Sequence, residues 1–174
     1  MSAVRTTKPE PTEFRAYYAR YIEQVASGDI LTTLAKQMEA TQTLLRGLPP
    51  TIATHSYAPG KWTVNEVVGH VLDAERIFSS RALRFARNDP QPLPGFEQDD
   101  YVKNSTFNYY PLSELASELA SVRQSTIGLF KHLDDDAWLR RGVASDAEVT
   151  VRALAYIIAG HELHHRHILG TKYL

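Results

Sequence analysis

Residues 150–170 read TVRALAYIIAGHELHHRHILG, and the spacing of their apolar side chains indicates an amphipathic helix that begins after Thr150 and ends at Gly170. One face of this helix is a continuous seam that repeats at steps of four and three residues, as the core-facing seam of a helical bundle does. Two histidines therefore take core positions one turn apart on the same face. The seam consists of Leu154, Ile158, His161, His165 and Ile168.

Three further segments show the same helical period, and no run alternates with a period of two over the length of a strand. Thr63 and Glu66 form a capping box before the second segment, and Asp29 suits the cap of the first. Four long amphipathic helices predict an all-α protein built as a four-helix bundle. The three segments are residues 30–46, 64–88 and 112–133, and a shorter helix is expected within residues 13–25.

The connection between the second and third long helices is longer than a simple turn requires. Residues 89–110 begin with three prolines within six positions, so the connection cannot start as regular helix. About 20 extended residues reach ~70 Å, whereas a helix of about 24 residues is only ~36 Å long. The connection can therefore run the whole length of the bundle and leave the second and third helices parallel.

The composition is that of a globular protein, with 43% hydrophobic and 22% charged residues, and excludes a disordered, collagen-like or coiled-coil chain. The formal net charge of −1 offers no electrostatic basis for binding nucleic acid or an anionic membrane. Cysteine is absent, which excludes disulfides, a thiol nucleophile and cysteine-bound metal clusters. We expect a soluble, cytoplasmic protein without a membrane span, with a flexible lead-in at residues 1–12 before a single domain at 13–174.

The two inward histidines suggest a metal site. Buried neutral imidazoles need polar partners, and a divalent ion such as zinc or nickel is one that two imidazoles at this spacing can share. His70 is a third candidate ligand, since it lies on the inward seam of the second long helix. The alternative is that the histidines are core residues whose hydrogen bonds are satisfied by carbonyl groups or by Tyr156. Either way, three histidines from two helices are predicted to face the core.

The segment from His161 to His165 also matches the His-Glu-x-x-His pattern of zinc peptidases, in which Glu162 would be the general base. Such enzymes take a third ligand downstream, but only nine residues follow His165. Because His167 flanks the seam and points elsewhere on the helix, Tyr173 is the only later side chain left that could ligate the metal. A peptidase is therefore the weakest of the functional hypotheses.

Two charged residues near His70 are weaker candidates for the site. Asp73 is one turn away and could orient the second ring nitrogen of His70. Arg81 falls on the same inward seam, and a buried arginine needs an acidic partner or an anionic ligand. The acidic residues that could serve as its partner are Glu97, Asp99 and Asp100 in the long connection.

Three stretches of sequence resemble the DinB / YfiT-like superfamily, and they occur in the order found in that family. They are YAPGKWTVNEVVGH at 57–70 followed by DAERIF at 73–78, PGFEQDDY at 94–101, and AGHELHH at 159–165. The resemblance covers roughly residues 20–174. It implies a four-helix bundle with an up-down-down-up path, one bound divalent metal, and His70, His161 and His165 as the metal ligands.

The resemblance also suggests an activity. Members of the family that this sequence resembles include S-transferases that use bacillithiol or a similar small thiol, a mycothiol-dependent isomerase and metal-dependent hydrolases. Many members are homodimers, so the resemblance also implies a homodimer. We therefore expect a metal-dependent enzyme that activates a water or a low-molecular-weight thiol against a small-molecule substrate. The alternative is a non-catalytic, metal-stabilised binding or stress-response module, in which a protein side chain closes the fourth metal position.

Overall fold

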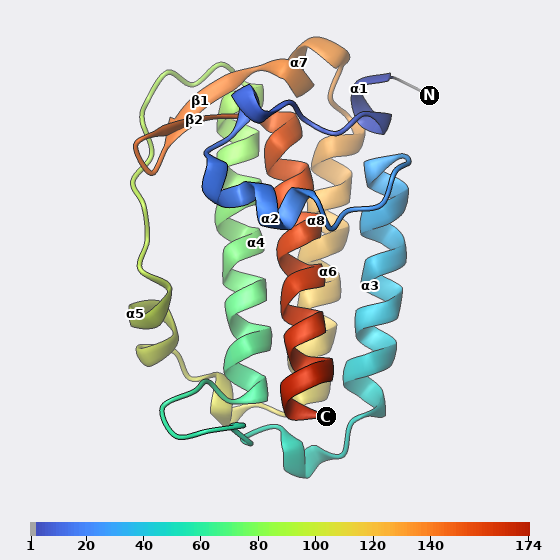
Figure 1. Cartoon of the computed structure of the whole chain (residues 1–174), viewed down its shortest axis with the longest axis vertical. Helices are drawn as coiled ribbons and strands as arrows, with labels where there is room; N and C mark the ends of the chain where they lie inside the picture. Colours follow the sequence, from blue (N-terminus) through green and yellow to red (C-terminus); the bar gives the residue numbers. More distant parts are fainter. Residues whose placement is uncertain (1–2) are drawn as a thin grey trace.

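The computed structural model describes residues 3–174 and forms a bundle of four long helices, as predicted (Figure 1). Helices α3 and α4 lie at opposite corners, because each of them packs against both α6 and α8. In Figure 1, α4 and α6 run in the same direction, whereas α3 and α8 run in the opposite one. The long helices are α3 (Ile30–Gly47), α4 (Val64–Ala86), α6 (Leu112–Lys131) and α8 (Val151–Ile168).

The predicted helix starts are correct. The Asp29 carboxylate accepts a hydrogen bond from the Thr32 amide at 3.0 Å and caps α3. At the start of α4, the Glu66 amide donates to the Thr63 hydroxyl at 3.1 Å, and the Thr63 amide donates to the Glu66 carboxylate at 2.7 Å. This reciprocal pair satisfies two backbone donors that the first turn of a helix leaves free. Thr150 caps α8 through the Ala153 amide.

The long connection after α4 descends along the outside of the bundle to the start of α6, which makes these two helices parallel (Figure 1). It contains the short helix α5 (Gln98–Lys103) and a 3₁₀ turn, η4 (Phe107–Tyr109). Near its beginning, Leu93 forms a parallel bridge with Ala144. The Leu93 amide donates to the Val143 carbonyl at 2.9 Å, so backbone hydrogen bonds hold the connection in place.

The segment between α6 and α8 contains a short helix and a hairpin, although no strand was predicted from the sequence. Helix α7 (Asp135–Leu139) is followed by the antiparallel strands β1 (Arg141–Ala144) and β2 (Ala147–Thr150). Ser145 and Asp146 form the two-residue turn, with φ values of 53° and 61°. Both values are left-handed, as a hairpin turn of this length requires. Each strand has only four residues, too few for a period of two to be read from the sequence.

The N-terminal segment is built from short turns and not from the single helix expected at residues 13–25. It comprises α1 (Ala3–Thr6), the 3₁₀ turns η1 (Pro11–Glu13) and η2 (Ala16–Tyr18), and α2 (Ala19–Ile22). Residues 1–12 were expected to be a flexible lead-in; within the described part of this segment, Arg5 pairs with Asp29 at 2.5 Å. Residues 1 and 2 lie outside the described part of the chain.

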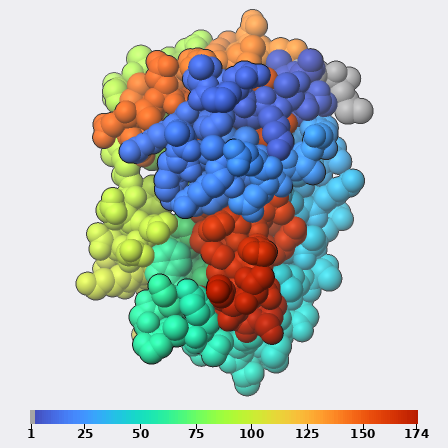
Figure 2. All heavy atoms as spheres, viewed as in Figure 1, coloured from blue at the N-terminus to red at the C-terminus, as the bar shows by residue number. Residues whose placement is uncertain are grey.

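This N-terminal segment lies directly on α8, and Figure 2 shows it covering one half of that helix. Gly160 allows the close approach. A Cβ atom at this position would lie only 2.1 Å from the carbonyl oxygen of Tyr21, so any other residue would push α2 away. Tyr21 of α2 therefore packs beside position 161 of α8, with its ring centroid 5.4 Å from that of His161.

The end of α8 also differs from the prediction, because the helix does not stop at Gly170. It continues as a π-helical turn, η5 (Leu169–Tyr173), whose first and last side chains are buried. The Tyr173 hydroxyl donates to the Trp62 carbonyl at 2.6 Å and joins the end of the chain to the loop before α4. Tertiary packing thus overrides the usual role of glycine as a helix terminator.

Two apolar clusters make up most of the core, and polar side chains lie between them along α4 and α8. One cluster contains Phe78, Leu154 and Ile158, and the other contains Val68 and Leu169. His70 and His161 occur between these clusters in the sequences of their helices, and both are buried. Among residues 3–174, none of the helices combines the length and apolar character needed to cross a membrane.

Candidate metal centre

The three histidines predicted to face the core meet at one point. His70 extends from the second turn of α4, and His161 and His165 extend from successive turns of α8. The Nε2 atom of His161 is 3.1 Å from Nε2 of His70 and 3.2 Å from Nε2 of His165. One nitrogen atom from each ring lies within 4.8 Å of the other two. The helical spacing of i and i+4 explains how two of them share a face.

This donor set fits a divalent cation better than it fits three uncharged rings alone. A neutral imidazole nitrogen offers either one proton or one lone pair. A proton shared by two nitrogens can satisfy only one of the two short contacts that His161 Nε2 makes. Two nitrogens bound tetrahedrally to one zinc ion at about 2.05 Å lie about 3.3 Å apart, close to the 3.1 Å and 3.2 Å that separate Nε2 of His161 from Nε2 of His70 and of His165.

Burial keeps the three rings neutral and their lone pairs available. It lowers the pKa of His70 to about 4, although the nearby Asp99 carboxylate acts in the opposite direction. Burial lowers the pKa of His165 to about 3, with His70 adding to the effect. The pKa of His161 lies well below 6.5, because the ring is buried between the two other histidines. Protons therefore compete weakly for these nitrogens at neutral pH.

The metal-free protein is expected to lose stability as the pH falls below 6.5. Unfolded histidines take up protons near pH 6.5, whereas His70 and His165 do so only near pH 4 and pH 3. The unfolded state then binds more protons, so each such histidine lowers the free energy of unfolding by up to about 1.4 kcal/mol per pH unit. The loss of stability is complete once the pH has fallen to the pKa values of the folded state, about 4 for His70 and about 3 for His165. The melting temperature of chelator-treated protein, measured between pH 6.5 and these values, tests this prediction.

The control for this pH dependence is the His161→Ala, His165→Ala variant. It removes two of the three depressed histidines, so its melting temperature should fall less steeply below pH 6.5. Equal slopes for the variant and the wild type would contradict the assignment of the pH dependence to these rings.

Aromatic packing orients the histidines, and the carboxylate expected to do so is placed elsewhere. The Trp62 ring lies 4.9 Å from the His70 ring, and the Tyr21 ring lies 5.4 Å from the His161 ring. Asp73 instead approaches Arg76 at 3.5 Å on the outer side of α4, and no hydrogen bond joins it to His70 among the described residues. The orienting role predicted for Asp73 is therefore wrong.

A cavity of about 480 Å³ opens beside the histidine cluster. Its walls come from the N-terminal segment, α4, α8, the hairpin and the long connection, and Figure 2 shows a recess between that connection and α8. No fourth histidine, aspartate or glutamate among residues 3–174 joins the cluster, so its side toward the cavity is open. The lining that concerns the chemistry consists of His70, His161, Tyr18, Phe78, Glu97 and Asp99.

Two groups of cavity residues are not evident from the sequence. The first group is Tyr17, Tyr18 and Tyr21 of the N-terminal segment. Because the backbone of this segment is irregular, no helical period in the sequence shows that the three side chains lie on one face; only their close spacing points to it. Glu97 and Asp99 were expected as partners of Arg81. They face the cavity instead, and neither forms an ion pair within the described part of the chain.

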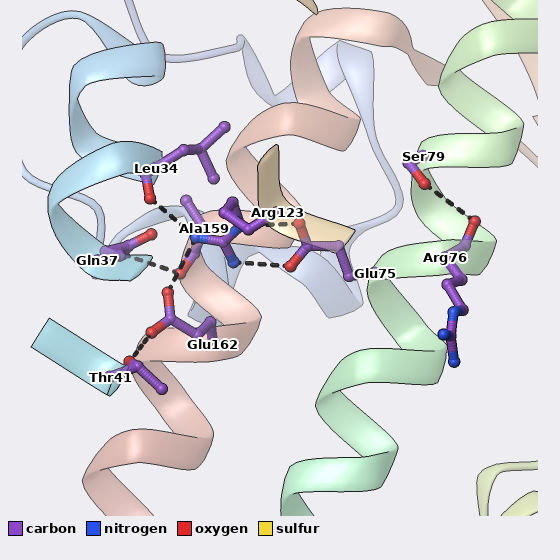
Figure 3. Close-up of polar contacts among 9 residues, drawn as sticks. All are labelled: Leu34, Gln37, Thr41, Glu75, Arg76, Ser79, Arg123, Ala159 and Glu162. Carbon is purple, nitrogen blue, oxygen red and sulfur yellow. Dashed lines mark hydrogen bonds and ion pairs between the residues drawn. The ribbon is translucent and has the colours of Figure 1, made fainter. Parts of the chain in front are cut away.

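Glu162 points away from the histidines, which argues against the peptidase hypothesis. Figure 3 shows its carboxylate between α3 and α6, where it accepts hydrogen bonds from Thr41 and from Arg123 Nη1, the latter at 3.3 Å. It is buried and has no access to the cavity. Tyr173, the remaining candidate ligand of that hypothesis, donates its hydroxyl to the Trp62 carbonyl. The side chains that a zinc peptidase needs are therefore engaged elsewhere.

Arg81 is buried, as its place in the inward seam predicts, but it lies about three turns from His70 along α4. Its Nη2 atom donates to the Pro94 carbonyl at 2.7 Å and to the Ser145 hydroxyl at 3.2 Å. It does not contact the histidines. The structure thus separates Arg81 from the metal centre.

Comparison with known proteins supports this fold. The solved structure of YfiT from Bacillus subtilis, described as a probable metal-dependent hydrolase with an unusual four-helix bundle topology, matches with a TM-score of 0.65. The two share 15% sequence identity, and the match covers 91% of this chain and 87% of the other. A comparison with curated proteins gave no match. The family model of the DinB superfamily matches residues 33–169, from α3 through α8, and the chain therefore belongs to the DinB superfamily.

Proposed function

We propose that this protein is a metal-dependent enzyme that activates a water molecule or a small thiol toward an electrophilic small molecule. His70, His161 and His165 would hold one divalent ion, with zinc or nickel the best match to three imidazole ligands. The observation that carries the proposal is the convergence of three Nε2 atoms, from the buried His70 and His161 and the half-buried His165, beside an open cavity. Structural zinc sites usually have four protein ligands, whereas catalytic sites keep a position open.

Such an ion, when bound, lowers the pKa of a coordinated water to about 7 and deprotonates a coordinated thiol. The residues that line the cavity supply the proton acceptor and the substrate-binding surface. Asp99 and Glu97 are carboxylates that can accept the proton released by the nucleophile. Phe78 and Tyr18 present rings that exclude water and hold an apolar substrate. The cavity volume of about 480 Å³ suits a small molecule and is too small for a folded macromolecule.

The likeness to YfiT adds support, since that protein is described as a probable metal-dependent hydrolase. At 15% identity the likeness does not extend to the reaction. Hydrolysis and thiol transfer differ only in which nucleophile occupies the open position. Both belong to the proposal, and the experiment separates them.

Activity should require both the metal and Asp99. Metal-loaded protein is assayed with a chromogenic ester for hydrolysis and with an aryl halide plus a small thiol for transfer. Chelation should abolish the active reaction, and Asp99→Asn should lower kcat on the order of 100-fold with an unchanged metal content. The control is Asp100→Asn, an exposed neighbour on α5 that does not line the cavity.

The second candidate is a non-catalytic module that uses the metal for stability. It requires a protein side chain to close the fourth metal position, and no fourth histidine, aspartate or glutamate among residues 3–174 joins the three histidines. Metal that raises the melting temperature but supports neither reaction, with Asp99→Asn indistinguishable from Asp100→Asn, would favour this module over the enzyme.

A further inference from the structure

Arg81 is a buried cation without a counter-charge. It and Arg123 are the two arginines that are buried in the described part of the chain. Arg123 is paired with both Glu75 and Glu162. Arg81 forms no ion pair among residues 3–174, and it donates hydrogen bonds to the neutral oxygens of Pro94 and Ser145.

A buried charge is unfavourable unless a group of opposite charge compensates it. Burial lowers the pKa of the Arg81 guanidinium, but this group remains protonated at neutral pH in proteins. The hydrogen bonds to Pro94 and Ser145 both come from one nitrogen, Nη2, and neither these bonds nor the nearby hydroxyl of Tyr18 removes the positive charge. The rings of Phe78 and Phe96, each with its centroid 5.9 Å from Cζ, compensate only weakly.

Arg81 faces a hollow of about 310 Å³ between α4 and the long connection, which we call the arginine pocket. Arginines line one side of it, apolar and aromatic side chains line the other, and none of its lining residues is acidic. Gly95 and Phe96 form a wall that also borders the cavity of the metal centre. The lining consists of Arg76, Ile77, Ser80, Arg81, Arg84, Leu93, Pro94, Gly95, Phe96 and Tyr101.

The two other arginines of the pocket already have partners at its rim. Arg76 pairs with Glu118 at 2.5 Å, and Arg84 pairs with Asp89 at 2.6 Å. Arg81 is the deepest of the three, and it alone lacks a carboxylate among the described residues. The missing counter-charge is therefore expected from outside the chain.

We propose that the arginine pocket binds a small organic anion, with its carboxylate or phosphate group on Arg81 and its apolar part against Leu93 and Phe96. Guanidinium groups bind planar oxyanions through paired hydrogen bonds, and a desolvated guanidinium does so more strongly than an exposed one. The volume of the hollow lies at the lower end of the range for small-molecule sites. This ligand would compensate the buried charge that the fold leaves unpaired.

The competing explanation is purely structural, since Arg81 ties Pro94 of the long connection to Ser145 of the hairpin turn. Both explanations predict that replacing Arg81 alters stability. Only the anion site predicts that an added organic anion binds with saturation and raises the melting temperature in a manner that depends on Arg81.

Calorimetric titration of the metal-loaded protein with phenyl phosphate and with benzoate tests the site, with chloride used to hold the ionic strength constant. We expect one ion bound per chain, binding at least 10-fold weaker in Arg81→Met, and wild-type binding in Arg87→Met. Arg87 is an exposed arginine of the same region that does not line the pocket. Inorganic phosphate, which has no apolar part, should bind more weakly than phenyl phosphate.

Three results would overturn the proposal. The first is that wild-type protein binds neither organic anion. The second is that Arg81→Met binds them as tightly as the wild type does, as it would if they bound at the metal. The third is that inorganic phosphate binds as tightly as phenyl phosphate. If Arg81→Met fails to fold, Ser80→Glu replaces it. Ser80 is exposed and lines the pocket, so a glutamate there should compete with the anion and abolish binding with an unchanged metal content. Wild-type binding by Ser80→Glu would equally refute the site.

Discussion

Replacing His161 and His165 together by alanine is expected to abolish metal binding, and His70→Ala alone is expected to weaken it severely. The wild-type chain should carry one divalent ion, held by nitrogens that lie 3.1 Å and 3.2 Å apart. Loss of a partner that merely orients a ligand already costs about 10–100-fold in affinity, so loss of a ligand should cost more. Plasma mass spectrometry of untagged protein, before and after dialysis against zinc or nickel, measures the metal content.

The matched control is His164→Ala. His164 lies between the two predicted ligands in sequence, but its ring packs against Tyr21 and it does not belong to the cluster. This variant should keep a full complement of metal. Added metal should also raise the melting temperature of the wild type and of His164→Ala, but not that of the double variant. A folded wild type that binds neither zinc nor nickel would refute the metal centre, and the histidines would then be core residues.

Replacing Arg123 by methionine is expected to destabilise the fold severely. The Arg123 guanidinium is fully enclosed and donates to Glu75 at 2.7 Å and 2.8 Å, to Glu162 at 3.3 Å and to the Leu34 carbonyl at 3.1 Å (Figure 3). Burial alone would lower the pKa of Arg123, but the two carboxylates overcome this effect and raise it. Arg123→Met would leave both carboxylates buried and unpaired, which costs about 3–5 kcal/mol.

Such a loss is a large part of the 5–15 kcal/mol that stabilises an ordinary domain. Urea denaturation followed by circular dichroism measures it. The double variant Arg123→Met, Glu75→Gln should recover part of the loss, because one of the unpaired charges is removed with the arginine. The control is Arg76→Met, which breaks exposed ion pairs on the outer side of α4 and should cost no more than about 1 kcal/mol. An unchanged urea midpoint for Arg123→Met would contradict this role.

Glu162 shows why a short motif alone is a weak guide to function. The sequence between His161 and His165 fits a zinc peptidase, yet neighbouring positions of a helix point in different directions. The two histidines face α4, whereas Glu162 faces Thr41 and Arg123. The pattern fixes which residues share a helical face, but the packing of α8 against α2, α3 and α4 decides what each face meets.

The helix boundaries and their caps were largely predictable because they depend on residues one turn apart. Thr63 and Glu66 satisfy each other locally, and so do Asp29 and Thr32. The pairing of Leu93 with Ala144 was not predictable, since it joins residues that are distant in sequence. The hairpin was not predictable because its strands of four residues are too short to show a period of two. Tertiary contacts also set the irregular path of the N-terminal segment.

The sequence by itself determined that this protein is an all-α bundle with three inward histidines, because hydrophobic periodicity places whole helical faces toward the core before any partner is known. The same periodicity placed Arg81 on the face of its helix that is turned toward the core. Only the tertiary structure decided that the three imidazoles meet, that Glu97 and Asp99 face their cavity, and that Arg81 has no acidic partner among the described residues. These features depend on how the four helices and the long connection are arranged in space. Periodicity along one helix carries no information about the distance to another.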